Sequence, residues 1–200
     1  MSESDRKLAL EPHRTALIPI DVQQGFDYPP WGPRNNPAME ANGLRLLGAW
    51  RAQGLPLIHV RHDSVIEGSS LQPTHPGNAF RAGFEPLPGE ALVSKSVNAA
   101  FIGTDLDLRL RRRGVDCVAL FGISTDMCVS TTARVAANLG YRTVVVADAC
   151  ACFDLRDEHG RTIAADDIAR AHLATLRAEF AEVVDADELI AALHPAHHAT

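Results

Sequence analysis

Short apolar runs alternate with stretches of helical periodicity along most of this chain. The apolar runs predict buried strands, because a strand that is covered on both faces has few polar positions. They occupy residues 15–20, 55–60, 91–94, 116–121 and 141–147, with a shorter run at 182–184. Apolar residues three and four positions apart predict helices at 39–53, 104–113, 127–139, 166–180 and 187–193.

These elements alternate along the chain, and such alternation predicts a mostly parallel sheet with helices on both faces. The fold class is therefore α/β, and a chain of 200 residues is expected to form a single domain. We predict a core at about residues 13–185 with flexible termini. Two long connections, 23–37 and 64–92, contain many prolines and glycines and are typical of functional loops.

The segment at residues 118–137 joins a buried strand to a helix and carries a cysteine at the joint. The strand ends at Gly122, and the polar residues at 124–126 are of types that cap helix N-termini. Unpaired amides and the helix dipole favour a thiolate at such a position, so we expect a lowered pKa for Cys128. A catalytic nucleophile and a packed core cysteine are the two interpretations of this residue.

Composition and charge limit the classes of molecule that this protein is expected to bind. Hydrophobic residues make up 46% of the chain and charged residues 22%, and the formal net charge is −6. The arginines at 109–113 indicate the exposed end of a helix, so nucleic acid is not an expected partner. The sequence shows neither an apolar signal region nor a run long enough to span a bilayer. We therefore expect a cytoplasmic protein without membrane partners.

Four cysteines are present, at Cys117, Cys128, Cys150 and Cys152. A reducing compartment argues against a disulfide framework. Cys117 and Cys150 fall in or beside apolar runs and are expected in the core. The C-x-C spacing of Cys150 and Cys152 matches neither a thiol redox pair nor a usual zinc site, so both of those functions are disfavoured.

Three chemically distinct side chains follow predicted strands. Asp21, Lys95 and Cys128 each stand at a carboxyl end, and in a parallel sheet those ends share one edge. A thiolate attacks a carbonyl carbon, a carboxylate takes and returns the proton, and a cation holds both partners charged. Backbone amides at the start of the helix would receive the oxyanion. The pattern therefore predicts an Asp-Lys-Cys triad.

Three motifs, in this order, resemble the isochorismatase-like cysteine hydrolase superfamily over residues 15–153. The motifs are Asp21-Val-Gln-Gln, Lys95-Ser-Val-Asn-Ala-Ala-Phe and Gly122-Ile-Ser-Thr-Asp-Met-Cys128-Val-Ser-Thr-Thr-Ala. That superfamily includes nicotinamidases, N-carbamoylsarcosine amidohydrolases, ureidoacrylate and biuret hydrolases, and true isochorismatases. The resemblance implies a three-layer α/β/α, Rossmann-like fold and a homo-oligomer, either a dimer or a tetramer.

The resemblance also implies a role for individual residues. Asp21 matches the acid/base of the superfamily, Lys95 its triad lysine and Cys128 its nucleophile. The Ile123–Ser124 bond matches the place of a cis peptide bond. The backbone amides of Ser124 and Cys128 would then form the oxyanion hole.

Two departures narrow the expected chemistry. Nicotinamidases carry a metal-binding Asp-x-His after the second strand, whereas this chain has Arg61-His62-Asp63-Ser64. We therefore predict no metal and no cofactor, although His59, His62 and His75 are the histidines that would otherwise cluster. True isochorismatases cleave a vinyl ether without needing the cysteine, so its presence favours hydrolysis of a C–N bond.

The sequence thus predicts an amidohydrolase that acts on a small amide, lactam or ureido compound through a thioester. Its small-molecule substrate is expected to contact aromatic and amide side chains of the loops. These candidates are Phe26, Trp31, Asn78, Phe80, Asn98 and Phe101. The alternatives are an isochorismatase-type hydrolase of a non-amide bond and a catalytically silent binding protein on the same fold.

Overall fold

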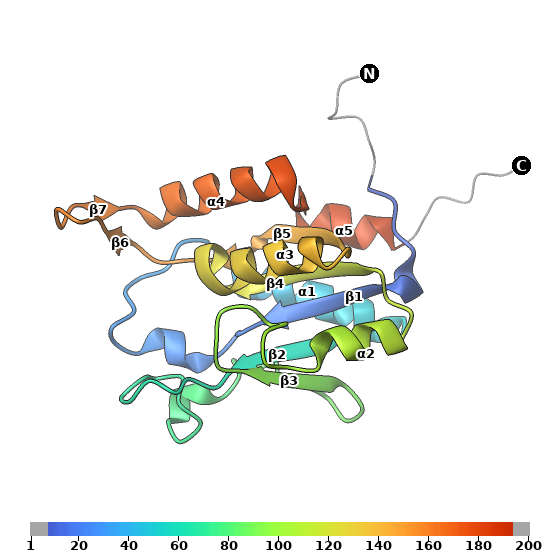
Figure 1. Cartoon of the computed structure of the whole chain (residues 1–200), viewed down its shortest axis with the longest axis horizontal. Helices are drawn as coiled ribbons and strands as arrows, with labels where there is room; N and C mark the ends of the chain where they lie inside the picture. The colour runs from blue at the N-terminus through green and yellow to red at the C-terminus, as the bar shows by residue number, and fades with distance from the viewer. Residues whose placement is uncertain (1–7, 194–200) are drawn as a thin grey trace, which may run out of the picture.

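The computed structural model describes residues 8–193 and is built on a six-stranded sheet (Figure 1). All neighbouring strands of this sheet are parallel, in the order β3-β2-β1-β4-β5-β8. The strands are β1 (Thr15–Ile20), β2 (Ile58–His62), β3 (Ala91–Lys95), β4 (Cys117–Ile123), β5 (Arg142–Ala151) and β8 (Glu182–Val184). The predicted flexible termini fall partly on residues 1–7 and 194–200, which lie outside the described residues.

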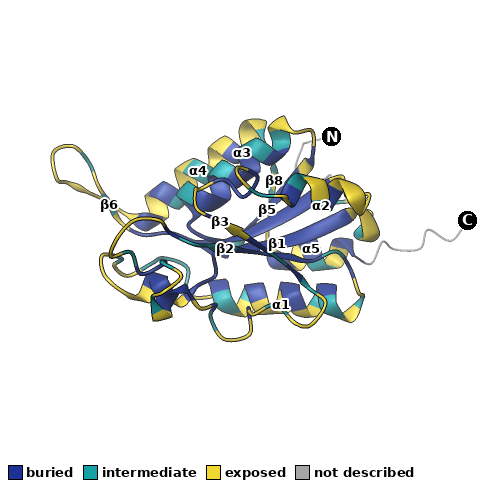
Figure 2. Cartoon of the chain, turned by 60° about the horizontal axis from the view of Figure 1, so that its bottom comes forward, coloured by how far each residue is buried: buried dark blue, intermediate teal, exposed yellow. Residues whose placement is uncertain are grey.

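Helices cover both faces of the sheet, which gives the three layers that were predicted. Figure 2 shows α1 on one side and α2, α3 and α4 on the other, and α5 packs beside α1. The helices are α1 (Met39–Ala52), α2 (Leu106–Arg112), α3 (Ser130–Asn138), α4 (Ala165–Glu179) and α5 (Ala186–Ala192). Among the described residues, no helix combines the length and the apolar character needed to cross a membrane.

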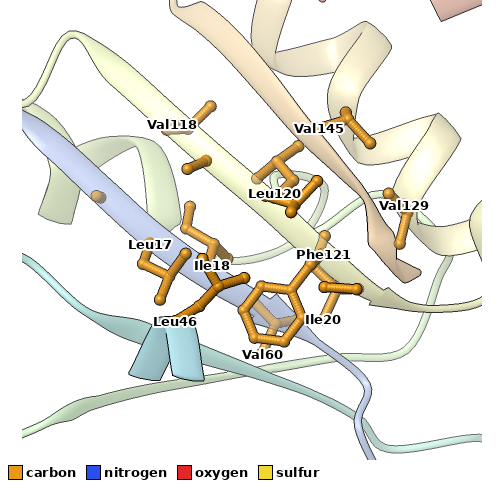
Figure 3. Packing of buried hydrophobic residues seen from close by; sticks show 14 of the residues in the cluster. Leu17, Ile18, Ile20, Leu46, Val60, Val118, Leu120, Phe121, Val129 and Val145 are labelled. Carbon is orange, nitrogen blue, oxygen red and sulfur yellow. The ribbon is translucent and has the colours of Figure 1, made fainter. Parts of the chain in front are cut away.

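The core lies along the two central strands. Every residue of β1 and of β4 is buried, because both strands have neighbours on each side and helices above and below. Figure 3 shows side chains of β1, β2, β4 and β5 packed with Leu46 of α1 and Val129. This packing explains why the runs at 15–20 and 116–121 contain almost no polar residue.

The strand order places a topological switch point between β1 and β4. From β1 the chain proceeds outward through β2 and β3, and it then returns to pair β4 with the other side of β1. Ligands of open α/β sheets bind where two neighbouring strands lead away in opposite directions like this. Asp21 follows β1 and Cys128 follows β4, so both lie beside this switch point.

Gly122 makes the close approach of these two strands possible. It pairs with Ile20 across β1 and β4 and has a φ of 138°. A Cβ atom at this position would lie 2.0 Å from the carbonyl oxygen of Ile20. Only glycine therefore fits here, immediately before the loop that leads to Cys128.

Three local expectations were wrong. β5 was expected to end near Asp148, but it continues to Ala151 through a register shift against β4. The polar Asp148 marks that irregularity, where its carboxylate accepts the amides of Asn42 and Ala186. The polar segment after β5 forms a short antiparallel hairpin of β6 (Leu155–Arg156) and β7 (Thr162–Ile163). The helix expected from residue 127 begins instead with a π-helical turn, Thr125–Val129.

Candidate active site

The three predicted triad residues meet at the carboxyl edge of the sheet. Lys95 Nζ lies 2.6 Å from Asp21 Oδ2 and 3.3 Å from Cys128 Sγ. All three residues are buried, with exposed fractions of 0% for Asp21, 3% for Lys95 and 7% for Cys128. The thiol also lies 3.7 Å from Oδ1 of Asn98, which is exposed. A carboxylate, an ammonium and a thiol thus share one buried corner, with the Asn98 amide at its rim.

Asp21 leaves the extended conformation as soon as β1 ends. Its φ is 52°, in the left-handed region that residues other than glycine seldom adopt. Such a conformation costs about 1–3 kcal/mol and persists only where the surroundings fix it. Here the amide of Asp21 donates to Val60 of β2, and its carbonyl accepts the amide of Gln23. The backbone is therefore held on both sides while the carboxylate faces Lys95.

The loop before Cys128 is tightly wound. The Ile123–Ser124 peptide bond is cis, and Ser124 precedes the π-helical turn that carries the cysteine. In an α-helix the Ser124 carbonyl would accept the amide of Cys128, four residues on; here it accepts that of Val129. The hydroxyls of Ser124 and Thr125 are buried and find no hydrogen-bond partner among the described residues.

Burial dominates the electrostatics of the triad. It raises the pKa of Asp21, and the opposing charge of Lys95 does not cancel this effect. Burial and the neighbouring Asp21 carboxylate also raise the pKa of the Cys128 thiol. The expectation of a lowered pKa from the helix start was therefore wrong. A neutral thiol instead faces a carboxylate that is a stronger base than an exposed aspartate.

The other three cysteines have no such neighbours. Burial raises the pKa of Cys117 to about 11 and those of Cys150 and Cys152 to about 12. The Cys152 thiol donates to the carbonyl of Ala165, which is a packing contact. Only Cys128 combines a thiol with both an ammonium and a carboxylate.

His62 belongs to this site, although the sequence analysis named it only together with His59 and His75. It is the last residue of β2, and its Nδ1 lies 3.1 Å from Lys95 Nζ. Burial and the charge of Lys95 lower the pKa of His62. The register between β2 and β3, which pairs His62 with Lys95, is the signal that would have identified it.

Asn78 supports the site through hydrogen bonds to the segments around it. Its side-chain amide donates to the carbonyls of His62 and Leu71, and to Asp63 Oδ1. It is buried, and its side-chain N–H groups are engaged with these framework oxygens. The structure therefore places this predicted substrate contact in the framework that fixes β2.

Aromatic side chains gather at the same edge of the sheet. The ring centroid of Trp31 lies 5.0 Å from that of Phe26 and 4.9 Å from that of Phe153. Phe26 follows β1, and Phe153 follows β5, whose last residue pairs with Ile123. Phe153 was not among the predicted contacts, because the sequence placed it in a polar loop after a shorter strand.

Two further predicted contacts pack against other aromatic rings. Phe80 is buried and packs against His59, with ring centroids 6.1 Å apart, while its backbone pairs with Gln23 just after Asp21. Phe101 stacks on Tyr141, just before β5, at the opposite edge of the sheet from Cys128. Neither of these aromatic contacts involves a triad residue, and the role of both rings in substrate binding stays a prediction.

One group of described residues has the donor atoms for a metal ion. Oxygen, nitrogen and sulfur ligand atoms of Asp21, His62 and Cys128 lie within 4.8 Å of one another. The same three side chains surround the Lys95 ammonium, which lies 2.6–3.3 Å from an atom of each. A dication at this point would have to displace the lysine, so the donor set fits an ammonium better than a metal.

Comparisons with known proteins place the chain in a family. The isochorismatase domain model matches residues 15–188. The isochorismatase family protein YrdC of Bacillus subtilis, which is uncharacterized, is 38% identical over 177 residues, covering 88% of this chain and 95% of YrdC. A crystal structure of an isochorismatase-family protein from Chromobacterium violaceum superposes with a TM-score of 0.90 at 44% identity, covering 94% and 97% of the two chains.

This chain belongs to the isochorismatase family and is a hydrolase of that family. A relative with a more specific name is the ureidoacrylate amidohydrolase RutB of Methylobacterium radiotolerans. It is 29% identical over 182 residues, which cover 71% of this chain and 69% of RutB.

Proposed function

We propose that this protein hydrolyses the C–N bond of a small amide, lactam or ureido compound through a thioester on Cys128. The observation that carries the proposal is the position of Lys95 Nζ, within hydrogen-bonding distance of both Asp21 and Cys128. A true vinyl-ether hydrolase needs no thiol there. The name of RutB, an amidohydrolase, favours the same bond type.

The chemistry follows from the protonation states. As Cys128 Sγ attacks the carbonyl carbon, the thiol proton passes to Asp21, and Lys95 stabilises the single negative charge as it moves from the carboxylate to the sulfur. The amides of Ser124 and Cys128 receive the oxyanion. Asp21 then donates the proton to the nitrogen, the C–N bond breaks, and an amine or ammonia leaves. Water, deprotonated by Asp21, cleaves the thioester to a carboxylic or carbamic acid and restores the thiol.

A substrate panel tests the proposal. Primary amides, lactams, ureido compounds and a vinyl ether are incubated with the parent and with Cys128→Ala, and products are followed by mass spectrometry. We expect turnover of at least one C–N substrate and an acyl adduct on Cys128 in rapidly quenched samples. Cleavage of the vinyl ether alone, or equal turnover by Cys128→Ala, would contradict the proposal. Binding without turnover would indicate a silent binding protein.

A further inference from the structure

His62 lies between the strands that carry the charged members of the site. β2 separates β3, which ends in Lys95, from β1, which precedes Asp21. Neighbouring strands are about 4.8 Å apart, so the lysine side chain has to cross β2 to reach Asp21. His62 ends β2 in register with Lys95, and side chains paired in this way project from the same face. The lysine therefore passes the imidazole on its way to the carboxylate.

The protons of Lys95 determine what His62 does. An ammonium group has three N–H donors and no acceptor. Its three neighbours are Asp21 Oδ2 at 2.6 Å, His62 Nδ1 at 3.1 Å and Cys128 Sγ at 3.3 Å. Each donor thus has one acceptor, provided that Nδ1 of His62 carries no proton. The neutral imidazole then holds its proton on Nε2.

Side-chain amides hydrogen-bond both the backbone N–H and the backbone C=O of His62. Its amide donates to Gln23 Oε1 at 2.8 Å, and its carbonyl accepts from Gln23 Nε2 and Asn78 Nδ2, both at 3.1 Å. Both Gln23 and Asn78 are buried. Two buried amide side chains therefore fix the backbone from which the imidazole of His62 projects.

We propose that His62 is a positioning residue whose neutral Nδ1 accepts a hydrogen bond from the Lys95 ammonium and holds that ammonium between Asp21 and Cys128. The inference adds a fourth residue to the proposed triad and rests on that proposed function for its catalytic consequence. The hydrogen bond itself is independent of any substrate.

The charges around His62 support this state. Burial and the ammonium of Lys95 lower its pKa, while Asp21 and Asp63 oppose that effect. These groups come from β3, from the end of β1 and from the residue after β2; the neutral thiol of Cys128 also faces the ring. Protonation of His62 at acid pH would remove the acceptor and set an imidazolium against the ammonium.

Two substitutions of similar size separate hydrogen bonding from packing. His62→Asn keeps an acceptor, Oδ1, close to the place of Nδ1 but does not titrate near neutral pH. His62→Leu fills the space without an acceptor. The readout is the pH dependence of Cys128 alkylation by iodoacetamide, located by mass spectrometry. It needs no substrate, so its outcome is distinguishable from a failure of the proposed function.

We expect His62→Leu to raise the alkylation midpoint by about one pH unit, because a misplaced ammonium stabilises the thiolate less. His62→Asn should stay within a few tenths of a unit of the parent. Thermal unfolding of both variants serves as the folding control. An unchanged alkylation profile in a folded His62→Leu protein would overturn the inference.

Nitrogen-15 NMR of the His62 ring gives a second test that does not depend on the leucine variant. The resonances are assigned by their absence in His62→Asn. We expect the tautomer protonated on Nε2, titrating below the ordinary histidine range, and an upward shift of that pKa in Lys95→Met. The inference would also be overturned by a tautomer protonated on Nδ1, or by a His62 pKa that is the same in Lys95→Met as in the parent.

Discussion

Two carboxylates at opposite ends of the strands, one buried and one half-buried, each face a basic side chain and a histidine of β2. Near the amino ends, Glu90 pairs with Arg51 at 2.7 Å and with His59 at 2.8 Å. At the carboxyl ends, Asp21 pairs with Lys95, which also contacts His62. The two clusters contain similar residue types, but the two carboxylates differ in how completely their oxygens are hydrogen-bonded.

Glu90 has a partner on each oxygen. Oε1 accepts from Arg51 Nε, and Oε2 accepts from Arg51 Nη2, from the amide of Leu87 and from His59. Although burial raises its pKa, these hydrogen bonds together lower the pKa of Glu90 to about 2. A carboxylate of this kind is a weak base, so the cluster of Arg51, Glu90 and His59 fits a structural role.

The hydrogen bonding of the Asp21 carboxylate, by contrast, is incomplete. Its Oδ1 is buried and has no hydrogen-bond partner among the described residues, and its pKa is raised. A buried acceptor without a donor costs about 1–3 kcal/mol, and folding retains it here beside a thiol. An unsatisfied carboxylate with a raised pKa, rather than an ion pair as such, therefore distinguishes a site of proton transfer from a structural cluster.

Removal of the nucleophile is the severest test of this contrast. Cys128→Ala should reduce turnover by more than about 10⁴-fold, because no other thiol contacts a base and a cation. Cys117→Ala, Cys150→Ala and Cys152→Ala should keep most of the parent activity. Steady-state rates on a substrate from the panel measure the effect, with thermal unfolding as the control. Equal loss in a folded Cys150→Ala protein would contradict the assignment.

Removal of the unsatisfied carboxylate should have the next largest effect. Asp21→Asn leaves the shape of the site but cannot take or return the proton, so turnover should fall by about 10²–10⁴-fold. The same assay applies, and circular dichroism checks the fold. Near-parental turnover by Asp21→Asn would show that Asp21 transfers no proton and has only a structural role, as Glu90 does.

These tests concern residues that the sequence identified, and their identification has a physical basis. Asp21, Lys95 and Cys128 each follow an apolar run, and a parallel sheet brings such positions to one edge regardless of their separation along the chain. The sheet itself could be predicted because β1 and β4 are buried on both faces and carry almost only apolar residues.

The features that escaped prediction depend on relations between segments. His62 is one of nine histidines, and only the register of β2 against β3 sets it beside Lys95. The extension of β5 follows from a register shift against β4, and Phe153 joined the aromatic cluster as a consequence. The raised thiol pKa reflects the depth of burial, which a helix-start argument does not contain.

The third prediction separates the charges within the site. Lys95→Met removes the cation that stabilises the thiolate, so the alkylation midpoint of Cys128 should rise by about one pH unit or more. Asp21→Asn removes the neighbouring anion, so the midpoint should fall even though turnover is lost. Iodoacetamide alkylation across pH measures both. An unchanged midpoint in Lys95→Met would disprove the coupling.

The fourth prediction concerns the satisfied carboxylate. Glu90→Gln should leave turnover within about twofold of the parent but lower the free energy of unfolding by up to about 3 kcal/mol at neutral pH. Because the pKa of Glu90 falls from 4.5 to about 2 on folding, its contribution is complete above pH 4.5 and is lost as the pH falls towards 2. Urea unfolding of parent and variant across that range should therefore show curves that converge at acid pH. A constant difference would contradict the shifted pKa.

The smallest expected effect is that of metal removal, where we predict none. The donor atoms of Asp21, His62 and Cys128 converge as zinc ligands would, but they converge on the Lys95 ammonium. A dication and the ammonium repel each other in so small and buried a space, so binding would require the lysine to leave. Turnover should survive exhaustive dialysis against EDTA or dipicolinate, with metal content followed by mass spectrometry. Lys95→Met is the matched variant, because losing the ammonium should strengthen zinc binding at this corner. Activity that disappears with the chelator and returns with zinc or iron would show that the ammonium does not exclude the metal.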